Sequence, residues 1–266
     1  MPDQAPLDVI VLAGDRGSHD PLASHAGVAG KTLVEVGGQP MLLRVLETLS
    51  AWSRLGRVVV VAPETPQHRA ALDSIDFATV NMARIAPESS PSRSVAAALE
   101  ACRRERPVLL VTADHPLLDT GWLDQLLQAD RHADLTVGLV EYQAVMKRFP
   151  GSRRTRYRFR DTSICGTNLF AFHTIRADAV VALWRQIEQQ RKRPWRIVSM
   201  LGWGMLGRYL SGRLTLSDAL EALSDKTGAR IGACLLDDPL SAVDVDSPED
   251  LALVEQVIDS RVAPCS

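Results

Sequence analysis

A glycine-containing loop follows the first apolar run of the chain, and its composition suits the binding of a phosphate chain. The run ends in Leu12 and Ala13, and Gly14 opens the loop. Glycine lets backbone N–H groups approach a phosphate without a Cβ in the way. Lys31, farther along the same stretch, would add a cation for the phosphates. The pattern favours a phosphate-binding loop, although a surface loop with turn glycines has the same composition.

A second candidate for chemistry is Asp114, which directly follows the apolar run at residues 107–113. That run has the sequence of a buried strand, so Asp114 would lie at the strand's carboxyl end. A carboxylate that faces a triphosphate needs a hard cation between them, and Mg²⁺ prefers oxygen ligands of this kind. Asp114 is therefore a candidate metal ligand, with an N-cap or turn acid as the structural alternative.

Arginines occupy every second position in the basic segment from Arg154 to Arg160 (RTRYRFR). In a strand, a period of two places them all on one face. Because arginine suits bidentate recognition of phosphate, we expect Arg156 and Arg158 to bind the phosphate of an acceptor. A charged edge strand that prevents edge-to-edge pairing would have the same pattern.

Residues 191–213 combine arginines and a lysine with tryptophan, methionine and leucine. This composition is typical of a helix that lies in a membrane interface, which predicts a peripheral membrane contact. Several glycines interrupt any long apolar face, and this favours a helical subdomain or a homodimer contact instead.

Short apolar runs alternate with helical patterns in the first half of the chain, and this order predicts how the candidate residues are positioned. The expected strands are residues 8–13, 57–62, 107–113 and 134–140, and the expected helices are 40–52, 67–75, 92–103 and 119–130. Such alternation implies an α/β fold of three layers, with a mostly parallel twisted sheet flanked by helices. Ligands of these sheets lie outside the carboxyl ends of the strands.

The second half of the chain departs from this rhythm. We expect a strand at 165–172, a helix at 176–191, apolar helical sequence at 194–226, a strand at 229–236 and a short strand end at 242–246. Ser247 and Pro248 then have the sequence of a helix start, with serine as the N-cap. We interpret residues 1–266 as one domain with a helical insertion on the acceptor side at about 142–230.

The bulk composition argues against several functional classes. The formal net charge of −2 provides no basic footprint for nucleic acid. The four cysteines form no CxxC pair, which argues against zinc and thiol redox chemistry. The N-terminus lacks the pattern of a signal peptide, and no apolar run reaches the ~18 residues that a membrane span needs. We therefore expect a cytoplasmic protein without a transmembrane segment.

The spaced motifs resemble the MobA-like nucleotidyltransferases, which are the molybdenum-cofactor guanylyl- and cytidylyltransferases and their relatives. The loop is neither GxxxxGK[ST] nor GxGxxG. The family pattern is a strand, L-A-G-G-x-G, a lysine and then L-hydrophobic-G-x-P-hydrophobic. The matching residues here are Leu12, Ala13, Gly14, Arg16 and Gly17, then Lys31 and residues 36–42, with Asp15 in place of the second glycine. The resemblance implies that the loop binds the NTP phosphates and that Lys31 offsets their charge.

Other stretches resemble the family in the same order along the chain. The D-x-P motif implies that Asp114 is the catalytic Mg²⁺ ligand, and the segment at 92–99 implies that Ser94 contacts the nucleotide base. The closing motif at 244–251 resembles D-hydrophobic-x-T-P-E-D-L and implies Asp244 as the second metal ligand. Asp246 is the alternative ligand, and helix capping is its structural reading. Asn168 would contact the acceptor or sugar, unless it is a polar residue at a strand edge.

The resemblance also implies an activity and a fold. The fold would be of the nucleotide-diphospho-sugar transferase (GT-A) type. The enzyme would use Mg²⁺ to transfer a nucleoside monophosphate from an NTP to a phosphorylated small-molecule acceptor, with release of pyrophosphate. One alternative is a GT-A-type glycosyltransferase that uses a nucleotide sugar, although such an enzyme would carry a D-x-D motif. The other is a non-catalytic nucleotide sensor, which an acid at position 15 in the phosphate loop would suit.

Overall fold

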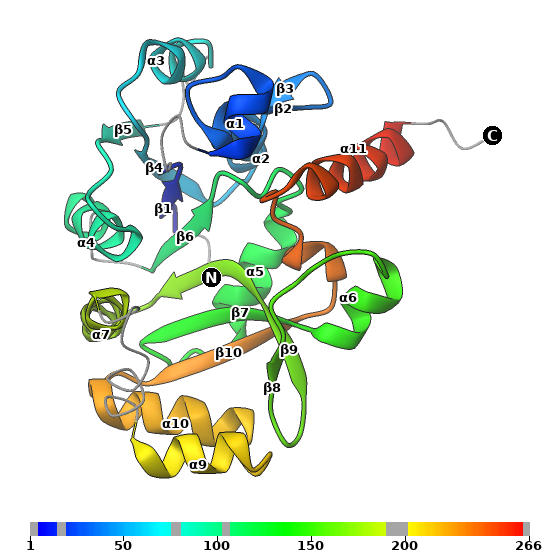
Figure 1. Ribbon diagram of the computed structural model, residues 1–266. Coiled ribbons are helices and arrows are strands. Elements are labelled where there is room, and N and C mark those ends of the chain that lie inside the picture. Colours follow the sequence, from blue (N-terminus) through cyan, green and yellow to red (C-terminus); the bar gives the residue numbers. More distant parts are fainter. Residues whose placement is uncertain (1–4, 15–19, 76–80, 103–106, 190–201, 263–266) are drawn as a thin grey trace.

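One mixed sheet runs through the middle of the computed structural model, which describes residues 5–14, 20–75, 81–102, 107–189 and 202–262 (Figure 1). Its strands are β1 (Leu7–Leu12), β4 (Leu55–Val61), β5 (Asn81–Ile85), β6 (Val108–Thr112), β7 (Leu135–Glu141), β8 (Tyr157–Arg158), β9 (Ser163–Phe172) and β10 (Ile231–Leu236). They form an eight-stranded sheet of order β10-β7-β9-β6-β1-β4-β5, with β8 paired to β9.

The sheet is parallel except around β9. β1 pairs in parallel with both β4 and β6, and β5 and β10 are parallel to their neighbours β4 and β7. β9 is antiparallel to β6 and to β7, between which it lies. The prediction of a mostly parallel sheet flanked by helices is confirmed.

Helices cover both faces of the sheet because alternate residues of each buried strand point to opposite sides. On one face, Val9 and Val11 of β1 belong to a core cluster with residues of α2 (Met41–Ser50), α3 (Pro66–Asp73) and α5 (Thr120–Ala129). On the other face, Ile10 belongs to a cluster with residues of α4 (Pro91–Ala101) and α7 (Asp178–Gln189). α10 (Leu216–Thr227) packs on this second cluster through Leu220 and Leu223.

A third apolar cluster joins segments that are far apart in the sequence. It contains Leu22 of α1 (Pro21–Ala26), Val145 of α6 (Tyr142–Arg148) and Val254 of α11 (Pro248–Val262). Val36 of the small hairpin β2 (Glu35–Val36) and β3 (Gln39–Pro40) belongs to the same cluster. This packing brings the stretches that begin near residues 20, 142 and 243 to one side of the sheet.

The strand end expected at 242–246 is wrong. The chain there forms a short 3₁₀ helix, η5 (Pro239–Ala242), which Asp238 caps by accepting a hydrogen bond from the Leu240 N–H. Residues 243–246 then have no regular structure, and the Val245 N–H donates to the carbonyl oxygen of Asp114 at 2.9 Å. The apolar residues of this stretch are buried under α11 and α6 instead of joining the sheet.

The basic segment forms much less strand than its alternation predicts. Only Tyr157 and Arg158 pair with β9, so the expected strand over 154–160 is reduced to two residues. The apolar region expected to be helical contains α9 (Trp203–Leu210) and α10, whereas residues 190–201 lie outside the described part of the chain. None of the described helices has the length and hydropathy to cross a membrane.

Candidate active site

Lys31 is presented by a short 3₁₀ turn, η3 (Lys31–Leu33), that α3 supports. The Ala29 N–H donates to Oε1 of Gln67 at 2.5 Å, and the ring of buried His68 lies beside the hydroxyl of Thr32 at 3.5 Å. Burial lowers the pKa of His68, so its ring is neutral in this position. The start of α3 therefore positions the turn that carries the lysine.

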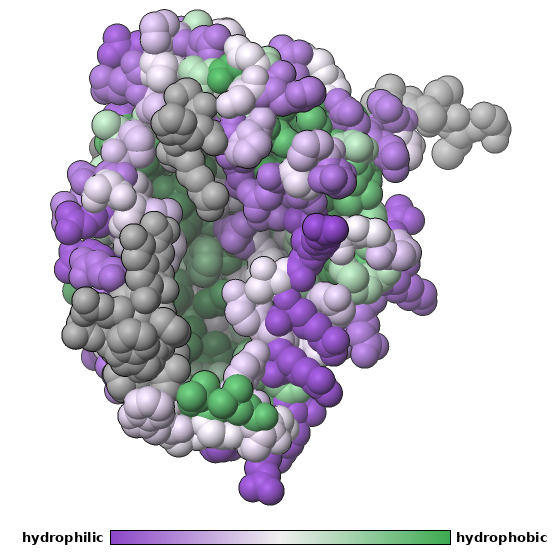
Figure 2. Space-filling model, viewed as in Figure 1, coloured by the Kyte–Doolittle hydropathy of each residue, from purple (hydrophilic) through white to green (hydrophobic). Residues whose placement is uncertain are grey.

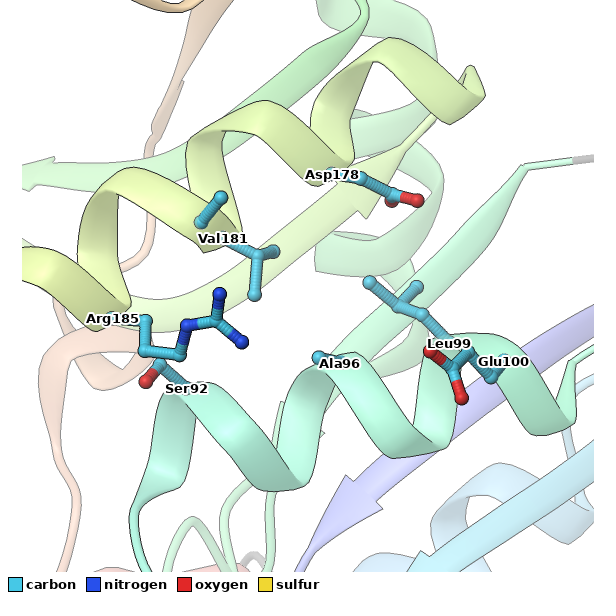
Figure 3. Close-up of a pocket in the computed structure, with 8 residues that line it drawn as sticks. Ser92, Ala96, Leu99, Glu100, Asp178, Val181 and Arg185 are labelled. Atoms are coloured by element: carbon cyan, nitrogen blue, oxygen red, sulfur yellow. The ribbon is translucent and has the colours of Figure 1, made fainter.

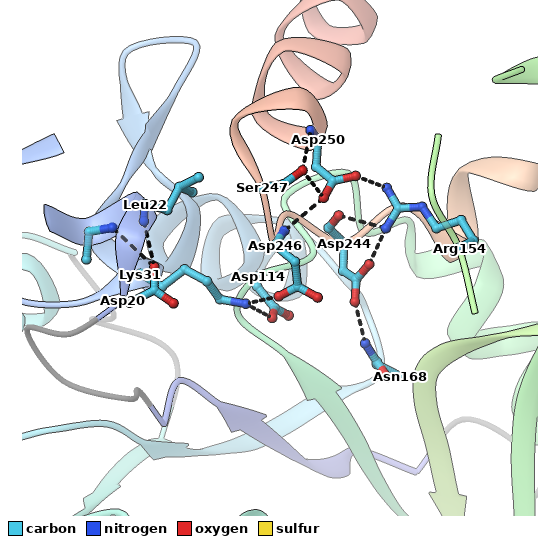
Figure 4. A network of polar contacts seen from close by, with 11 residues as sticks. Asp20, Leu22, Lys31, Asp114, Arg154, Asn168, Asp244, Asp246, Ser247 and Asp250 are labelled. Atoms are coloured by element: carbon cyan, nitrogen blue, oxygen red, sulfur yellow. Dashed lines mark hydrogen bonds and ion pairs between the residues drawn. The ribbon is translucent and has the colours of Figure 1, made fainter. Parts of the chain in front are cut away.

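The ammonium group of Lys31 lies between two carboxylates (Figure 4). Its Nζ is 2.6 Å from Oδ2 of Asp114 and 2.6 Å from Oδ1 of Asp246, and only 14% of the side chain is exposed. Burial by itself would lower the pKa of Lys31. The charges and hydrogen bonds of Asp114 and Asp246 outweigh burial and hold this pKa above its ordinary value. Lys31 is therefore a fixed cation in this site.

Asp114 lies immediately beyond the carboxyl end of β6, as the sequence predicts for a ligand-facing position. Burial would raise its pKa, but the adjacent Lys31 lowers it, so Asp114 is ionised. Its Oδ2 bonds Lys31, whereas its Oδ1 is buried and makes no hydrogen bond of ordinary geometry with the described residues. The Thr112 hydroxyl nevertheless lies close enough to the carboxylate to help lower the pKa of Asp114. A buried carboxylate oxygen without a donor is costly unless a cation or another donor occupies the space beside it.

Asp244 lies beside these groups and is held by two side chains. Asn168 donates from Nδ2 to Oδ2 of Asp244 at 2.9 Å, and Arg154 donates to Oδ1 (Figure 4). Burial and the neighbouring charges of Asp114 and Asp246 raise the pKa of Asp244 to about 6, although Arg154 and Lys31 oppose this shift. Burial is the larger cause of this shift, and repulsion from the two neighbouring carboxylates adds to it.

Ser247 caps α11, whereas the neighbouring Asp246 bonds Lys31. Ser247 caps the helix, because its Oγ accepts from the Asp250 N–H at 3.2 Å. The carboxylate of Asp246 does not cap and instead bonds Lys31. The backbone N–H of Asp246 donates to Oδ2 of Asp250 at 3.2 Å, which fixes its position at the end of the loop.

Arg154 belongs to this cluster although the sequence singled out its neighbours. Its side chain is 6% exposed and bonds both Asp244 and Asp250. Arg156 instead donates to Oγ of Ser163 at 3.0 Å and stacks over the ring of Tyr142. The alternation of arginines does not distinguish the buried member from its exposed neighbours.

Of the other predicted site residues, Arg158 and Gly14 are exposed and Ser94 is buried. Arg158, like Arg156, is exposed on the hairpin of β8 and β9. Ser94 is buried, and its Oγ accepts a hydrogen bond from the Glu88 N–H at 2.9 Å, which holds the loop before α4. Gly14 is exposed, and a Cβ added there would meet only Pro87 at 3.7 Å. Packing against the described residues therefore does not require glycine at position 14.

The other residues of the predicted phosphate loop are partly outside the described chain. Leu12 ends β1, and Ala13 is buried with its N–H bonded to the carbonyl oxygen of Val61 at 2.8 Å. Arg16 and Gly17 lie outside the described residues. β1 therefore delivers the start of the loop to the same side of the sheet as Asp114.

The cluster has the charge and chemistry that a divalent cation needs. Among the described residues, four carboxylates (Asp114, Asp244, Asp246 and Asp250) pair with two basic side chains, Lys31 and Arg154. No three or more His, Cys, Asp or Glu side chains converge as a metal cage within the described residues. Mg²⁺ commonly uses one or two carboxylates and completes its shell with phosphates and water. The Oδ1 of Asp114, which no donor among the described residues satisfies, and Asp244, whose pKa burial and neighbouring carboxylates raise, could supply the carboxylate ligands of such a cation.

A hollow opens on the face of the molecule that Figure 1 presents (Figure 2). Hydrophobic residues lie in its depth, and hydrophilic residues border one side. In the core cluster that includes α4 and α7, Leu12, Val137 and Phe170 are only partly buried. A concave surface with an apolar floor beside a few charged groups is the usual form of a small-molecule site.

A separate cavity of about 160 Å³ lies between α4 and α7 (Figure 3). Its lining residues are Ser92, Ala96, Leu99, Glu100, Asp178, Val181, Ala182 and Arg185. None of them belongs to the charged cluster around Lys31, so this cavity is not part of the candidate active site.

Comparisons with known proteins identify a family and several structures of the same fold. A family model described as the MobA-like NTP transferase domain matches residues 9–231. A solved structure from Thermus thermophilus, described as a hypothetical transferase, is 30% identical, with a TM-score of 0.77 over 92% of this chain and 99% of that one.

Two more distant structures share the fold. The 4-diphosphocytidyl-2C-methyl-D-erythritol synthase from Anaerococcus prevotii is 14% identical, with a TM-score of 0.58 over 97% of this chain and 100% of that one. A CMP:2-keto-3-deoxy-manno-octonic acid synthetase complexed with CTP is 13% identical, with a TM-score of 0.59 over 97% of this chain and 100% of that one.

Proposed function

The chain belongs to the family of MobA-like NTP transferase domains, and on that premise we propose that it transfers a nucleoside monophosphate from an NTP to a phosphorylated small-molecule acceptor. The observation that carries this proposal is the cluster at the carboxyl end of β6. There Lys31 bonds Asp114 and Asp246 within 2.6 Å, beside Asp244. A fixed cation among closely spaced carboxylates suits a triphosphate and a divalent cation better than it suits an uncharged substrate.

The proposed reaction is a single in-line displacement. A phosphate oxygen of the acceptor forms a bond to the α-phosphorus of the NTP, and the bond from that phosphorus to the β-bridging oxygen breaks. Pyrophosphate leaves with the electron pair of the broken bond. The protein contributes orientation and charge neutralisation, which are the main sources of catalysis in phosphoryl and nucleotidyl transfer.

Each charged group of the cluster has a proposed task in this reaction. Lys31 binds the phosphates and stabilises the negative charge that develops on the departing pyrophosphate. Asp114 and Asp244 are the residues that we assign to hold Mg²⁺, with Asp246 directed to Lys31 instead. When bound, the cation would neutralise phosphate oxygens and help to align the reactants.

The acceptor side of the proposed site is formed by residues 142–230. Asn168, which reaches Asp244, and Arg156 and Arg158 on the β8–β9 hairpin are the residues that we assign to the acceptor. One distant structural relative is a diphosphocytidyl synthase and another is described in complex with CTP. CTP is therefore the first donor to test, with GTP, ATP and UTP beside it.

Pyrophosphate release tests the proposal directly. The wild-type protein is mixed with each NTP, MgCl₂ and a panel of acceptors that contains sugar 1-phosphates, inositol phosphates, other alcohol phosphates and molybdopterin. We expect pyrophosphate with one donor and one acceptor class, and its loss in Lys31→Ala but not in the control Lys147→Ala, whose side chain is exposed on α6.

Two results would contradict the proposal and identify an alternative. Release of a nucleoside diphosphate from a nucleotide sugar, without pyrophosphate from any NTP, would indicate a glycosyltransferase. Tight binding of an NTP without turnover of any acceptor would indicate a nucleotide sensor. The sensor reading depends on Asp15, which lies outside the described residues.

A further inference from the structure

Arg154 is a buried cation on an otherwise exposed segment. Its side chain is 6% exposed, whereas the residues on either side of it, Arg153 and Thr155, are exposed. Taking a guanidinium group out of water is costly unless carboxylates and hydrogen bonds replace the lost solvent. The side chain of Arg154 nevertheless lies inside the charged cluster, where it pairs with Asp244 and Asp250.

The guanidinium group of Arg154 joins two carboxylates that come from different parts of the C-terminal region. Nη1 donates to the carboxylate of Asp244 and, at 3.0 Å, to the backbone oxygen of the same residue. Nη2 donates to Oδ1 of Asp250 at 2.5 Å. Asp250 is itself fixed, because its Oδ2 accepts from the hydroxyl of Ser247 at 2.8 Å and from the Asp246 N–H. Arg154 therefore ties Asp244 to the rigid first turn of α11.

Asp244 receives its second hydrogen bond from the opposite direction. Asn168 of β9 donates to the oxygen that Arg154 leaves free. One donor on each oxygen fixes the plane of a carboxylate, and each oxygen keeps a further lone pair for another partner. The groups that repel Asp244, namely Asp114 and Asp246, would otherwise favour its rotation away from them.

We propose that Arg154 is a positioning residue that, together with Asn168, holds the carboxylate of Asp244 toward Asp114 for metal binding. This inference rests on the proposed function, because it requires that a divalent cation and an NTP bind at the cluster. Arginine is required at this position because its planar fork bonds Asp244 and Asp250 at once, and lysine cannot make both contacts. The segment that carries the acceptor-side arginines is thereby connected to the metal site.

Three variants test the proposal. Arg154→Gln removes the charge and the fork, Arg154→Lys keeps only the charge, and Arg153→Gln removes the exposed neighbouring arginine as a matched control. The melting temperature of each protein is measured in MgCl₂ titrations with whichever of CTP, GTP, ATP and UTP gives the largest shift for wild type. The readout is the MgCl₂ concentration at the midpoint of that shift, which does not depend on turnover.

Mutation of a residue that orients a metal ligand typically lowers the metal affinity by about 10–100-fold. We therefore expect the MgCl₂ midpoint to rise by about 10–100-fold in Arg154→Gln, to rise less in Arg154→Lys and to stay at the wild-type value in Arg153→Gln. A residue with only a structural role would lower the melting temperature without moving the midpoint. An unchanged midpoint in either folded Arg154 variant would overturn the proposal, and Arg154→Lys decides the matter if Arg154→Gln does not fold.

The experiment separates this inference from the proposed function. A wild-type protein with no Mg²⁺-dependent shift for any of the NTPs overturns the proposed function, and the role of Arg154 with it. A clear wild-type shift whose midpoint is the same in Arg154→Gln overturns the role of Arg154 alone.

Discussion

Lys31 and Asp114 form the central ion pair of the cluster, and each depends on the other for its charge. Removing one partner of a buried pair leaves an uncompensated charge, which is more costly than the loss of the contact alone. In the protein without ligands, Lys31 also separates Asp114 from Asp246. The lysine thus stabilises the two carboxylates, and under the proposed function it offers its charge to the phosphates of the NTP.

Replacement of Lys31 should therefore affect turnover and stability in distinguishable ways. In Lys31→Met we expect pyrophosphate release to fall by about 10²–10³-fold, the usual effect of losing one preorganised charge-stabilising donor. We also expect MgCl₂ alone to raise the melting temperature of this variant more than that of wild type, since Mg²⁺ can replace the missing cation. Lys147→Met is the control. Full turnover in Lys31→Met would remove the lysine from the mechanism.

The pKa of Asp244 predicts a pH dependence of the metal-free protein. It is raised to about 6 from an ordinary value of 3.8. Between these values the unfolded chain is ionised while the folded chain keeps the proton, so stability falls as pH rises through this window and then levels off. Asp114 has the opposite shift, and its contribution is lost as pH falls.

The pH prediction is tested by urea unfolding of wild type and Asp244→Asn in the presence of EDTA. Because one pKa unit corresponds to about 1.4 kcal/mol, we expect wild type to lose on the order of 2–3 kcal/mol relative to Asp244→Asn between about pH 4 and pH 6. Above about pH 7 the two curves should run parallel. A constant difference across the whole range would show that Asp244 has an ordinary pKa.

Sequence reasoning identified most charged members of the cluster but not their pairing. Lys31 and Asp114 follow from residue type and from their places next to expected strands. Asp244 was preferred to Asp246 as a metal ligand only through the family resemblance, because both acids precede the same helix start. The structure distinguishes them by contact, since Asp246 bonds Lys31 and Asp244 bonds Arg154 and Asn168.

Among the structural elements, β9 is adapted to present Asn168. The register between β7 and β9 shifts near Gly138, and Asn168 has a φ of 56°, in the left-handed region that asparagine tolerates better than most residues. A Cβ at Gly138 would lie 2.4 Å from Oγ1 of Thr167. The irregularity turns the amide of Asn168 toward Asp244.

Two substitutions separate the backbone and side-chain roles of Asn168. Both Asn168→Gly and Asn168→Ala remove the hydrogen bond to Asp244, but only glycine accepts the positive φ without cost. We expect Asn168→Ala to be less stable than Asn168→Gly by about 1–2 kcal/mol in denaturant unfolding, and both to lose activity equally. Equal stabilities would show that the local backbone relaxes to another conformation.

The helix α9 exposes large apolar side chains, as the predicted membrane contact requires. None of its residues is buried, and Trp203 and Leu210 are 64% and 74% exposed. Part of the segment that suggested this contact, residues 191–201, lies outside the described chain. Peripheral membrane binding therefore stays a prediction: wild type should sediment with anionic vesicles and Trp203→Ser less so, whereas no sedimentation of wild type would end the idea.

At the scale of the whole molecule, the fold places five distant segments around one point. These segments are β1, η3, β6, β9 and the stretch before α11. β9, β6 and β1 are neighbours in the sheet, and the third apolar cluster packs the stretch before α11 beside them together with α1 and α6. Alternating strands and helices predicted the layers and the mostly parallel sheet. The antiparallel insertion of β9 between β6 and β7 could not be predicted, because a buried strand has the same composition in either direction.

The family membership confirms the resemblance of the spaced motifs. The likeness extends beyond the loop and the acids, since the family model matches residues 9–231. The choice of donor, acceptor and oligomeric state depends on side chains that composition and period do not reveal, and these stay predictions.

Nucleotide-dependent thermal stabilisation is the measurement that tests the account most directly. Wild type and Asp114→Asn are melted with CTP, GTP, ATP or UTP, each with and without MgCl₂. A ligand at 100 times its Kd stabilises a protein by about 2.7 kcal/mol, which corresponds to about 5–11 °C for a chain of this size. We predict such a shift for one NTP only with MgCl₂, and its absence in Asp114→Asn. No shift for any NTP, or an equal shift in Asp114→Asn, would contradict the proposed metal-dependent nucleotide site.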